Sequence, residues 1–295
     1  MVGLSEPRLS FSVEQTAKIN SLLRNESDVA YKRRVRYVLS YLDLSPGLSV
    51  LDCGTGMGFY LKVISALYPS CRLYGVDREE GVLSYARGHL AERGALLTQG
   101  DIHHLGFASE SFDRVVMSEI LEHLADDERA LREVWRVMKP GAILALTVPH
   151  RHYPYWYDPI NRVAEGLFRH PIRKGPFAGI WANHERLYEP AQVVDVMERA
   201  GFAIDAVQEI THYCFPATQT IVYTFGKGLI EHGLLPEFIG KSTHRFRGED
   251  NRGSALNPIN WVLALFNWID SWNESPARLA GVRTFVNIAV KARKA

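Results

Sequence analysis

Apolar and polar positions follow two alternating periods between residues 48 and 149. Short apolar runs typical of strands give way to patterns with apolar positions three and four residues apart, which are typical of helices. The predicted strands are 48–53, 72–77, 95–101, 112–118 and 142–148, and the predicted helices are 59–67, 79–93 and 126–138. Strands that alternate with helices of this length indicate a parallel, doubly wound sheet.

Ligands of such a sheet bind at the carboxyl ends of its strands, so the residues directly after each strand are the candidates for a site. Acidic residues, glycines and a histidine occupy these positions, from Asp52 to Gly58 and then at Asp77, Asp101, Glu119 and His150. Two further helical patterns, 12–23 and 28–42, precede the first strand.

The loop after the first strand carries three glycines at alternate positions, Gly54, Gly56 and Gly58, directly after Asp52. A dinucleotide-binding loop has the spacing GxGxxG and places pyrophosphate at a helix N-terminus, where an acid would repel it. An acid suits a ligand that carries an ammonium group. Asp77 can accept hydrogen bonds from both hydroxyls of a ribose, and Asp101 with Ile102 can bind an adenine edge. Together these groups describe S-adenosylmethionine.

Five segments in order then resemble the core of class I S-adenosylmethionine-dependent methyltransferases of the small-molecule type. They are VLDCGTGMG (50–58), VD (76–77), GDI (100–102), FDRVVMSEILEHL (112–124) and LREVWRVMKPGAILALTVP (131–149). The resemblance implies a Rossmann-like sheet of seven strands, mostly parallel, with an antiparallel last strand. It also implies a helix at 189–202, a sixth strand at 203–210 and a last strand at 282–294.

The resemblance further implies which residues bind the methyl donor. The glycine loop contacts the methionyl part, the acid after the second strand binds ribose, and the GD pair binds adenine. Glu119 begins the segment that lines the methionine end. The donor-binding residues are thus expected to be Asp52, Gly54, Gly56, Gly58, Asp77, Asp101, Ile102 and Glu119.

Two inserts interrupt this core, and additions of this kind usually form the acceptor site in the family. The expected organisation is an N-terminal helical segment (1–45), a donor-binding core (46–149), an acceptor insert (150–189), a core helix and strand (190–210), a second helical insert (211–281) and the final strand (282–295).

The first insert is rich in aromatic residues, and an apolar cage with few polar groups suits a greasy acceptor. Its expected acceptor-binding residues are Tyr153, Trp156, Trp181 and Tyr188. Imidazole titrates near neutral pH, so a histidine could remove a proton from the acceptor. The candidates are His150, His184 and His123. The alternative is that these histidines pack or cap loops.

The second insert contains an aromatic helical pattern around 258–272, with Trp261, Leu265, Trp268 and Trp272 on one stripe. Three interpretations stay open for it: a core helix that closes a lid, a homodimer contact, and a helix in the membrane interface, where tryptophan is favoured. It is too short to span a bilayer.

Composition narrows the function further. A formal net charge of +1 argues against a general nucleic-acid binder. The chain shows no signal-peptide pattern, and its three cysteines form no CxxC pair, so we expect a cytoplasmic protein, with peripheral membrane contact as an option. HExxH and paired-cysteine spacings are missing, so no metal is expected.

These observations predict an enzyme that methylates a hydrophobic small molecule, such as a lipid, quinone or polyketide, at oxygen or carbon. Two alternatives belong to other classes. One is a methyltransferase that acts on RNA or protein, which the neutral charge and the missing NPPY-like tetrapeptide disfavour. The other is a non-catalytic protein that binds S-adenosylmethionine.

Overall fold

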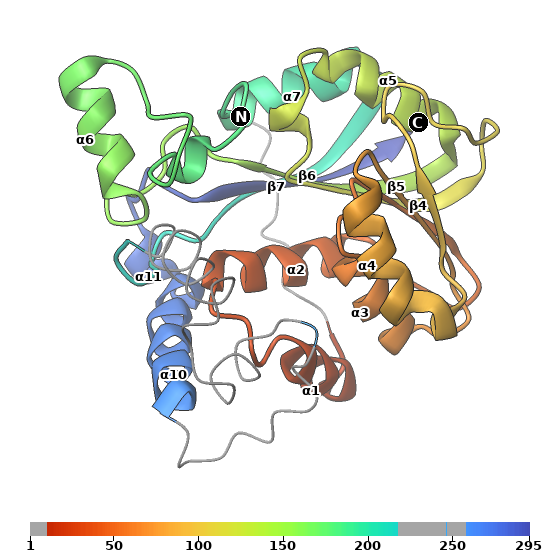
Figure 1. Cartoon of the computed structure of the whole chain (residues 1–295), viewed down its shortest axis with the longest axis horizontal. Coiled ribbons are helices and arrows are strands. Elements are labelled where there is room, and N and C mark those ends of the chain that lie inside the picture. The colour runs from red at the N-terminus through yellow and green to blue at the C-terminus, as the bar shows by residue number, and fades with distance from the viewer. Residues whose placement is uncertain (1–10, 218–245, 247–257) are drawn as a thin grey trace.

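A seven-stranded sheet with helices on both faces forms the core of the protein in a computed structural model that describes residues 11–217, 246 and 258–295 (Figure 1). The strands are β1 (Ser49–Cys53), β2 (Arg72–Asp77), β3 (Leu96–Gln99), β4 (Phe112–Ser118), β5 (Met138–Pro149), β6 (Phe202–Ile210) and β7 (Asn287–Lys294). Their order is β3-β2-β1-β4-β5-β7-β6. The first five strands pair in parallel, and β7 is antiparallel to β5 and β6. The predicted fold class is therefore confirmed.

The helices of the core lie close to their predicted positions. They are α1 (Val13–Leu22), α2 (Val29–Tyr41), α3 (Phe59–Leu67), α4 (Glu80–Leu90), α5 (Asp127–Val137) and α7 (Pro190–Arg199), with short 3-10 turns η1 (Ala91–Arg93) and η2 (Leu121–His123). At several helix N-termini a side chain accepts hydrogen bonds from the first free backbone N–H groups. Asp28 accepts hydrogen bonds from the backbone N–H groups of Ala30 and Tyr31 and so begins α2.

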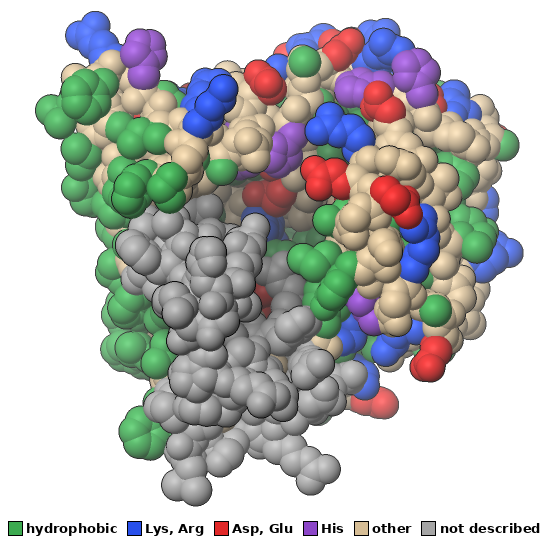
Figure 2. Space-filling view, viewed as in Figure 1, with side chains coloured by type: hydrophobic (Ala, Val, Ile, Leu, Met, Phe, Trp, Pro, Cys, Tyr) green, Lys and Arg blue, Asp and Glu red, His purple; other side chains and the backbone are tan. Residues whose placement is uncertain are grey.

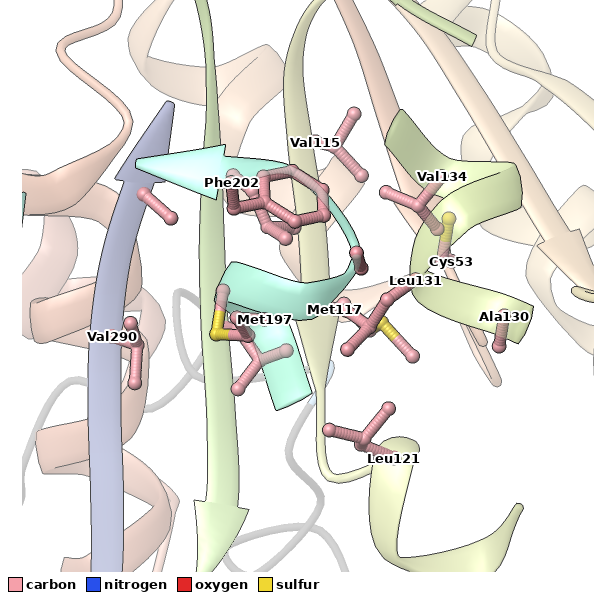
Figure 3. Close-up of a cluster of buried hydrophobic side chains, with 14 of the residues drawn as sticks. Cys53, Val115, Met117, Leu121, Ala130, Leu131, Val134, Met197, Phe202 and Val290 are labelled. Carbon is pink, nitrogen blue, oxygen red and sulfur yellow. The ribbon is translucent and has the colours of Figure 1, made fainter. Parts of the chain in front are cut away.

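Consecutive residues of the central strands point to opposite faces of the sheet, and each face has its own core. Leu51 and Val115 pack with α5 and α7, and Figure 3 shows part of this cluster around Met117, Leu131 and Met197. On the other face, the neighbouring residues of these strands pack with α2 and α3. Figure 1 shows these two helix pairs on opposite sides of the sheet. Both faces are buried, which explains the nearly continuous apolar runs in the sequence.

One predicted turn is wrong. The sequence KPG at 139–141 was expected to separate the helix from the fifth strand, but β5 already begins at Met138 and includes these residues. Met138 pairs with Phe112, and the register then shifts so that Ile143 pairs with Arg114. Gly141, with φ +74°, lies in the irregular stretch. A bulge in one strand therefore replaces the turn.

The inserts form smaller units on one side of the core. The first contains α6 (Pro159–Phe168) and the turn η3 (Gly179–Trp181), and the second contains α10 (Pro258–Asp270), η6 (Ser271–Glu274) and α11 (Pro276–Leu279). Figure 1 shows α6 and α10 at the same end of the molecule, with α6 above and α10 below the level of the sheet. The rest of the second insert, 218–245 and 247–257, lies outside the described residues.

A buried ion pair fastens α10 to α2. Arg33 donates from Nε to a carboxylate oxygen of Asp270 at 3.0 Å and from Nη2 to the backbone carbonyl of the same residue at 2.9 Å. The two side chains are only 5% and 6% exposed. On α10, Leu263 and Phe266 are buried, whereas Trp261 and Trp268 are exposed. Of the helices that the structure describes, none has the length and apolar composition needed to cross a membrane.

Candidate active site

A cleft of about 790 Å³ opens at the carboxyl ends of the central strands. One wall comes from the sheet and its loops: Cys53, Gly54, Val76, Asp77, Arg78, Glu79, Gly100, Asp101, Ile102, His103, Ile120, His123 and Leu124. The opposite wall comes from the first insert: Arg173, Lys174, Asn183, His184 and Glu185. Figure 2 shows acidic, basic and histidine side chains gathered around a hollow of this face.

The glycine loop lies at the base of the sheet wall, and its three glycines all have positive φ. Gly54 and Gly58 serve close packing, because a Cβ at Gly54 would collide with Ile120 and one at Gly58 with Leu90. A Cβ at Gly56 would meet no atom of the described residues within 4 Å. Of the three, Gly54 lines the cleft.

Asp77 ends β2 and holds the glycine loop. One carboxylate oxygen accepts a hydrogen bond from the backbone N–H of Gly56 at 2.8 Å, and the other accepts from the N–H of Glu79 at 3.0 Å. Asp101 follows β3 and accepts from the backbone N–H of His103 at 2.9 Å and from its ring at 2.7 Å. These bonds lower the pKa of Asp101. Asp77 and Asp101 both line the cleft.

Asp52 lies beneath the loop, only 1% exposed, and accepts a hydrogen bond from the Thr55 hydroxyl at 2.8 Å. Burial raises the pKa of Asp52 from 3.8 to about 7. The carboxyl group therefore stays protonated in the folded, ligand-free protein over a range where it would be ionised in the unfolded chain.

We expect Asp52→Asn to raise the melting temperature of the ligand-free protein, by an amount that grows from about pH 4 to about pH 7 and is then constant. Across this window the unfolded wild-type chain has released the proton that the folded protein still binds, so wild-type stability falls as pH rises. Melting curves between pH 4 and pH 8.5 measure the difference. Asp195→Asn, at an exposed carboxylate, serves as the control, and a pH-independent difference would show that Asp52 titrates normally.

Two histidines and a buried acid meet where the insert joins the sheet wall. Glu122 is fully buried, and its Oε1 lies 3.8 Å from Nε2 of His123 and 3.8 Å from Nε2 of His184. The His123 and His184 rings stand edge to face, 4.6 Å apart. His123 donates from Nδ1 to the backbone carbonyl of Asn183 at 3.0 Å, and Glu185 donates from its N–H to the carbonyl of Glu122 at 2.8 Å.

These groups have unusual proton affinities for physical reasons. Burial and the neighbouring charge of Glu119 raise the pKa of Glu122 well above its ordinary value. Burial and the neighbouring His123 lower the pKa of His184 to about 3, so this ring is neutral at pH 7. Perturbed groups that gather in a cleft are a signal of a functional site.

Glu119 lies behind the cleft with its carboxylate already partnered. Arg34 of α2 contacts it at 2.8 Å, Asn287 donates to it at 3.0 Å and Thr147 at 3.1 Å. Its φ of +56° is unusual for a residue with a side chain. The backbone turns sharply after β4 at this point, and the turn brings the segment with Glu122 and His123 to the cleft.

The comparisons with known proteins agree with this architecture. The methyltransferase domain family matches residues 51–146. A demethylmenaquinone methyltransferase of Chlamydia pneumoniae is 32% identical over 168 residues, which cover 55% of this chain and 73% of that protein. One of Roseiflexus sp. (strain RS-1) is 35% identical over 105 residues, which cover 35% of this chain and 44% of that protein.

This chain belongs to the class I S-adenosylmethionine-dependent methyltransferases. A solved S-adenosylmethionine-dependent methyltransferase from Mesorhizobium loti shares the fold, with a TM-score of 0.51 and 16% identity over 90% of this chain and 97% of that one. The chain spans about half the length of the first curated relatives it matches: 55%, 44% and 56%. S-adenosylmethionine is the methyl donor of this family.

Two acids of the cleft suit parts of the donor. Asp77 at the end of β2 and Asp101 after β3 both line the cleft, and carboxylates are acceptors for ribose hydroxyl groups and for an adenine amino group. When bound, S-adenosylmethionine supplies a methyl group on a cationic sulfur. Of the expected donor residues, Gly54, Asp77, Asp101 and Ile102 line the cleft. Gly56 is not among the lining residues, and Asp52, Gly58 and Glu119 support the cleft from beneath or behind.

The structure separates the three histidine candidates. His123 and His184 line the cleft. His150 does not: it is 1% exposed, its Nε2 lies 2.8 Å from Glu209, and its Nδ1 accepts from the backbone N–H of His152 at 2.8 Å. Both ring nitrogens are engaged, so its place in this structure is that of a packed histidine.

None of the four aromatic residues expected at the acceptor lines this cleft. Tyr153, Trp181 and Tyr188 are buried, and Trp156 is half-buried. Tyr153 and Trp181 form a cluster with Trp156 packed against it, and Tyr188 joins the main core. The aromatic pattern of the insert thus builds the support of the cleft wall. Arg173, whose guanidinium lies 4.9 Å from the Trp181 ring centroid, reaches the cleft over that support.

Several residues that line the cleft were not predicted from the sequence. Arg173, Lys174 and Asn183 come from irregular stretches of the insert, and no strand or motif marks them. Glu122 carried a signal, since it lies one residue before the candidate His123 and three after Glu119. Its burial and its position between two histidines became visible only in the folded chain.

Proposed function

We propose that this methyltransferase transfers a methyl group from S-adenosylmethionine to an oxygen or carbon of a hydrophobic small molecule, such as a lipid, a quinone or a polyketide. The observation that carries the proposal is that His123 and His184 face the same cleft as Gly54 and Asp77. The relatives that are named demethylmenaquinone methyltransferases support a small-molecule acceptor.

The roles of the residues follow from their positions. Asp77, Asp101 and Gly54, which line the cleft, hold the donor, and Asp52 supports the glycine loop from beneath. The insert closes the opposite wall and limits water, so proximity and alignment supply most of the rate enhancement. His123 and His184 line the cleft beside the acceptor, where an imidazole nitrogen can accept a proton from the acceptor or hold its hydroxyl group.

Exposed apolar side chains on the two inserts support a hydrophobic acceptor. Leu167 and Phe168 at the end of α6 are 72% and 71% exposed, and Trp261 and Trp268 on α10 are 68% and 59% exposed. Figure 2 shows apolar side chains along this edge of the molecule. A peripheral membrane contact and a homodimer would each cover them. Flotation with lipid vesicles and sedimentation equilibrium distinguish the two, and failure of both would remove this support.

The acceptor class is tested with methyl-labelled S-adenosylmethionine and four pools: lipid extract, hydroxylated aromatic metabolites, total tRNA and total protein. We expect label in one of the first two pools. Label confined to tRNA or protein would overturn the proposal in favour of the macromolecular alternative. Donor binding without label in any pool would favour the non-catalytic one.

We expect His184→Ala to lower kcat about 100-fold while leaving the affinity for S-adenosylmethionine unchanged, because the ring faces the acceptor side of the cleft. Turnover with the labelled donor and calorimetric titration of donor binding measure the two quantities. His170→Ala, at an exposed histidine of the same insert, is the matched control. Full activity of His184→Ala would remove this residue from the acceptor site.

A further inference from the structure

The carboxylate of Glu122 is buried without a hydrogen-bond partner. The side chain is 0% exposed, and neither of its oxygens makes a hydrogen bond within the part of the chain that the structure describes. Its distance of 3.8 Å from each of the two imidazole nitrogens is too long for a hydrogen bond. A buried carboxyl group without a hydrogen-bond partner requires an explanation, and a bound ion is one that would also engage the two imidazoles beside it.

The groups around Glu122 favour a metal ion as the missing partner. Nε2 of His123 and Nε2 of His184 both face Oε1 of Glu122. A carboxylate oxygen and two imidazole nitrogens that face one another are ligand types that bind divalent first-row metal ions.

The orientation of the His123 ring suits a metal ligand. Its Nδ1 donates to the backbone carbonyl of Asn183, so in the neutral ring the proton is on Nδ1 and Nε2 presents its lone pair toward Glu122. A histidine that binds a metal is held in this way by a hydrogen bond from its other nitrogen to a carbonyl or carboxylate.

The spacing of the three groups suits one ion. Their candidate ligand atoms all lie within 4.8 Å of one another. At a metal–ligand distance of about 2.1 Å, neighbouring ligand atoms are about 3.0 to 3.4 Å apart. Side-chain rotations that bring the atoms together by about an ångström are sufficient.

We propose that Glu122, His123 and His184 bind a divalent first-row transition metal ion whose open coordination positions face the cleft. Two imidazoles with one carboxylate suit ions such as Mn²⁺ or Zn²⁺ better than Mg²⁺, which prefers oxygen ligands. The two imidazoles line the cleft and the carboxylate lies behind them, so the free positions point to the space shared with the donor.

The site also specifies the acceptor, and this step rests on the proposed function. A hydroxyl oxygen of the acceptor fits an open position on the ion. Coordination lowers the pKa of such a hydroxyl, which releases its proton to solvent and leaves an oxygen nucleophile beside the donor. The acceptor is therefore a hydroxylated molecule, and methylation takes place at oxygen.

The sequence prediction of no metal considered spacings along the chain. His184 comes from the insert, far in sequence from Glu122 and His123, and no local motif contains all three. Two hydrogen bonds of the folded chain bring them together, one from the His123 ring to the carbonyl of Asn183 and one from the N–H of Glu185 to the carbonyl of Glu122.

The test is a Mn²⁺ titration of the full-length protein after removal of metals with a chelator, without donor or acceptor. Loss of the electron paramagnetic resonance signal of free Mn²⁺ reports binding, and competition with Zn²⁺ ranks the two ions. We expect one ion per chain with micromolar affinity. Glu122→Gln, which keeps the shape of the side chain, and His184→Ala should each weaken binding about 100-fold or more. His170→Ala should bind as the wild type does.

Binding of S-adenosylmethionine by Glu122→Gln confirms that this variant is folded. No binding by the wild type, or binding that Glu122→Gln leaves unchanged, would overturn the site, even if the protein methylates small molecules. Equal methylation by chelated and Mn²⁺-loaded protein, with the titration as expected, would overturn the acceptor step and leave the metal site standing.

Discussion

Asp77→Ala is expected to weaken the binding of S-adenosylmethionine about 100-fold, equivalent to ~2.8 kcal/mol. The proposed bonds of the carboxylate to the ribose are lost, and such bonds to a charged group contribute about 1.5–3 kcal/mol each. The glycine loop also loses its attachment, because Asp77 accepts from the backbone of Gly56 and Glu79 in the free protein. Calorimetric titration with S-adenosylmethionine and S-adenosylhomocysteine measures the change.

Two further variants make this result specific. Asp77→Asn keeps one acceptor oxygen for the loop and should lose about 10-fold in affinity, since charge-assisted bonds are roughly twice as strong as neutral ones. Asp195→Ala, at an exposed carboxylate on α7, should bind as the wild type does. Wild-type affinity in Asp77→Ala would mean that the donor does not contact the end of β2.

Asp270→Ala is expected to lower the free energy of unfolding by about 3 kcal/mol, since the buried Arg33 then keeps only the backbone carbonyl of residue 270 and the longer contact with Glu274 at 3.6 Å. Arg33 and Asp270 are almost fully buried and join α2 to α10. Asn273, whose amide donates to Asp270 and to the carbonyl of Tyr213, links the same pair to the end of β6. Urea denaturation followed by circular dichroism measures the loss.

The control for this prediction is the surface pair of Arg199 and Asp195. Exposed pairs contribute at most about 1 kcal/mol, so Asp195→Ala should change the free energy of unfolding little. Equal effects of the two substitutions would show that α10 does not depend on the buried pair. The comparison separates the contribution of the Arg33–Asp270 pair to stability from general effects of removing a carboxylate.

The fold and the cleft wall that the sheet forms were predictable because their signals are local in sequence. A buried parallel strand needs a continuous apolar run, and a ligand loop at its end needs glycine or a short polar residue. Asp77, Asp101 and Ile102 were found in this way, and all of them line the cleft. The error at 139–141 has the same origin, since proline and glycine indicate a turn whether the chain reverses or only bulges.

The cleft wall that the first insert forms was less predictable. Aromatic residues have the same sequence signal in a core and in a pocket. Tyr153 and Trp181 were expected at the acceptor and instead pack in the interior of the insert. His150 and His184 looked equivalent along the chain, yet one has both nitrogens engaged and the other faces the cleft. Partners that lie far apart in sequence decided these differences.

The sequence by itself determined the sheet, the glycine loop and the acids at the ends of β1 and β2 and after β3, since each depends on residues within a few positions of one another. Only the tertiary structure decided that Glu122 is buried beside His123 and His184 with no hydrogen-bond partner among the described residues. Burial and charge compensation are set by groups from separate segments, and these meet only when the insert folds against the end of the sheet.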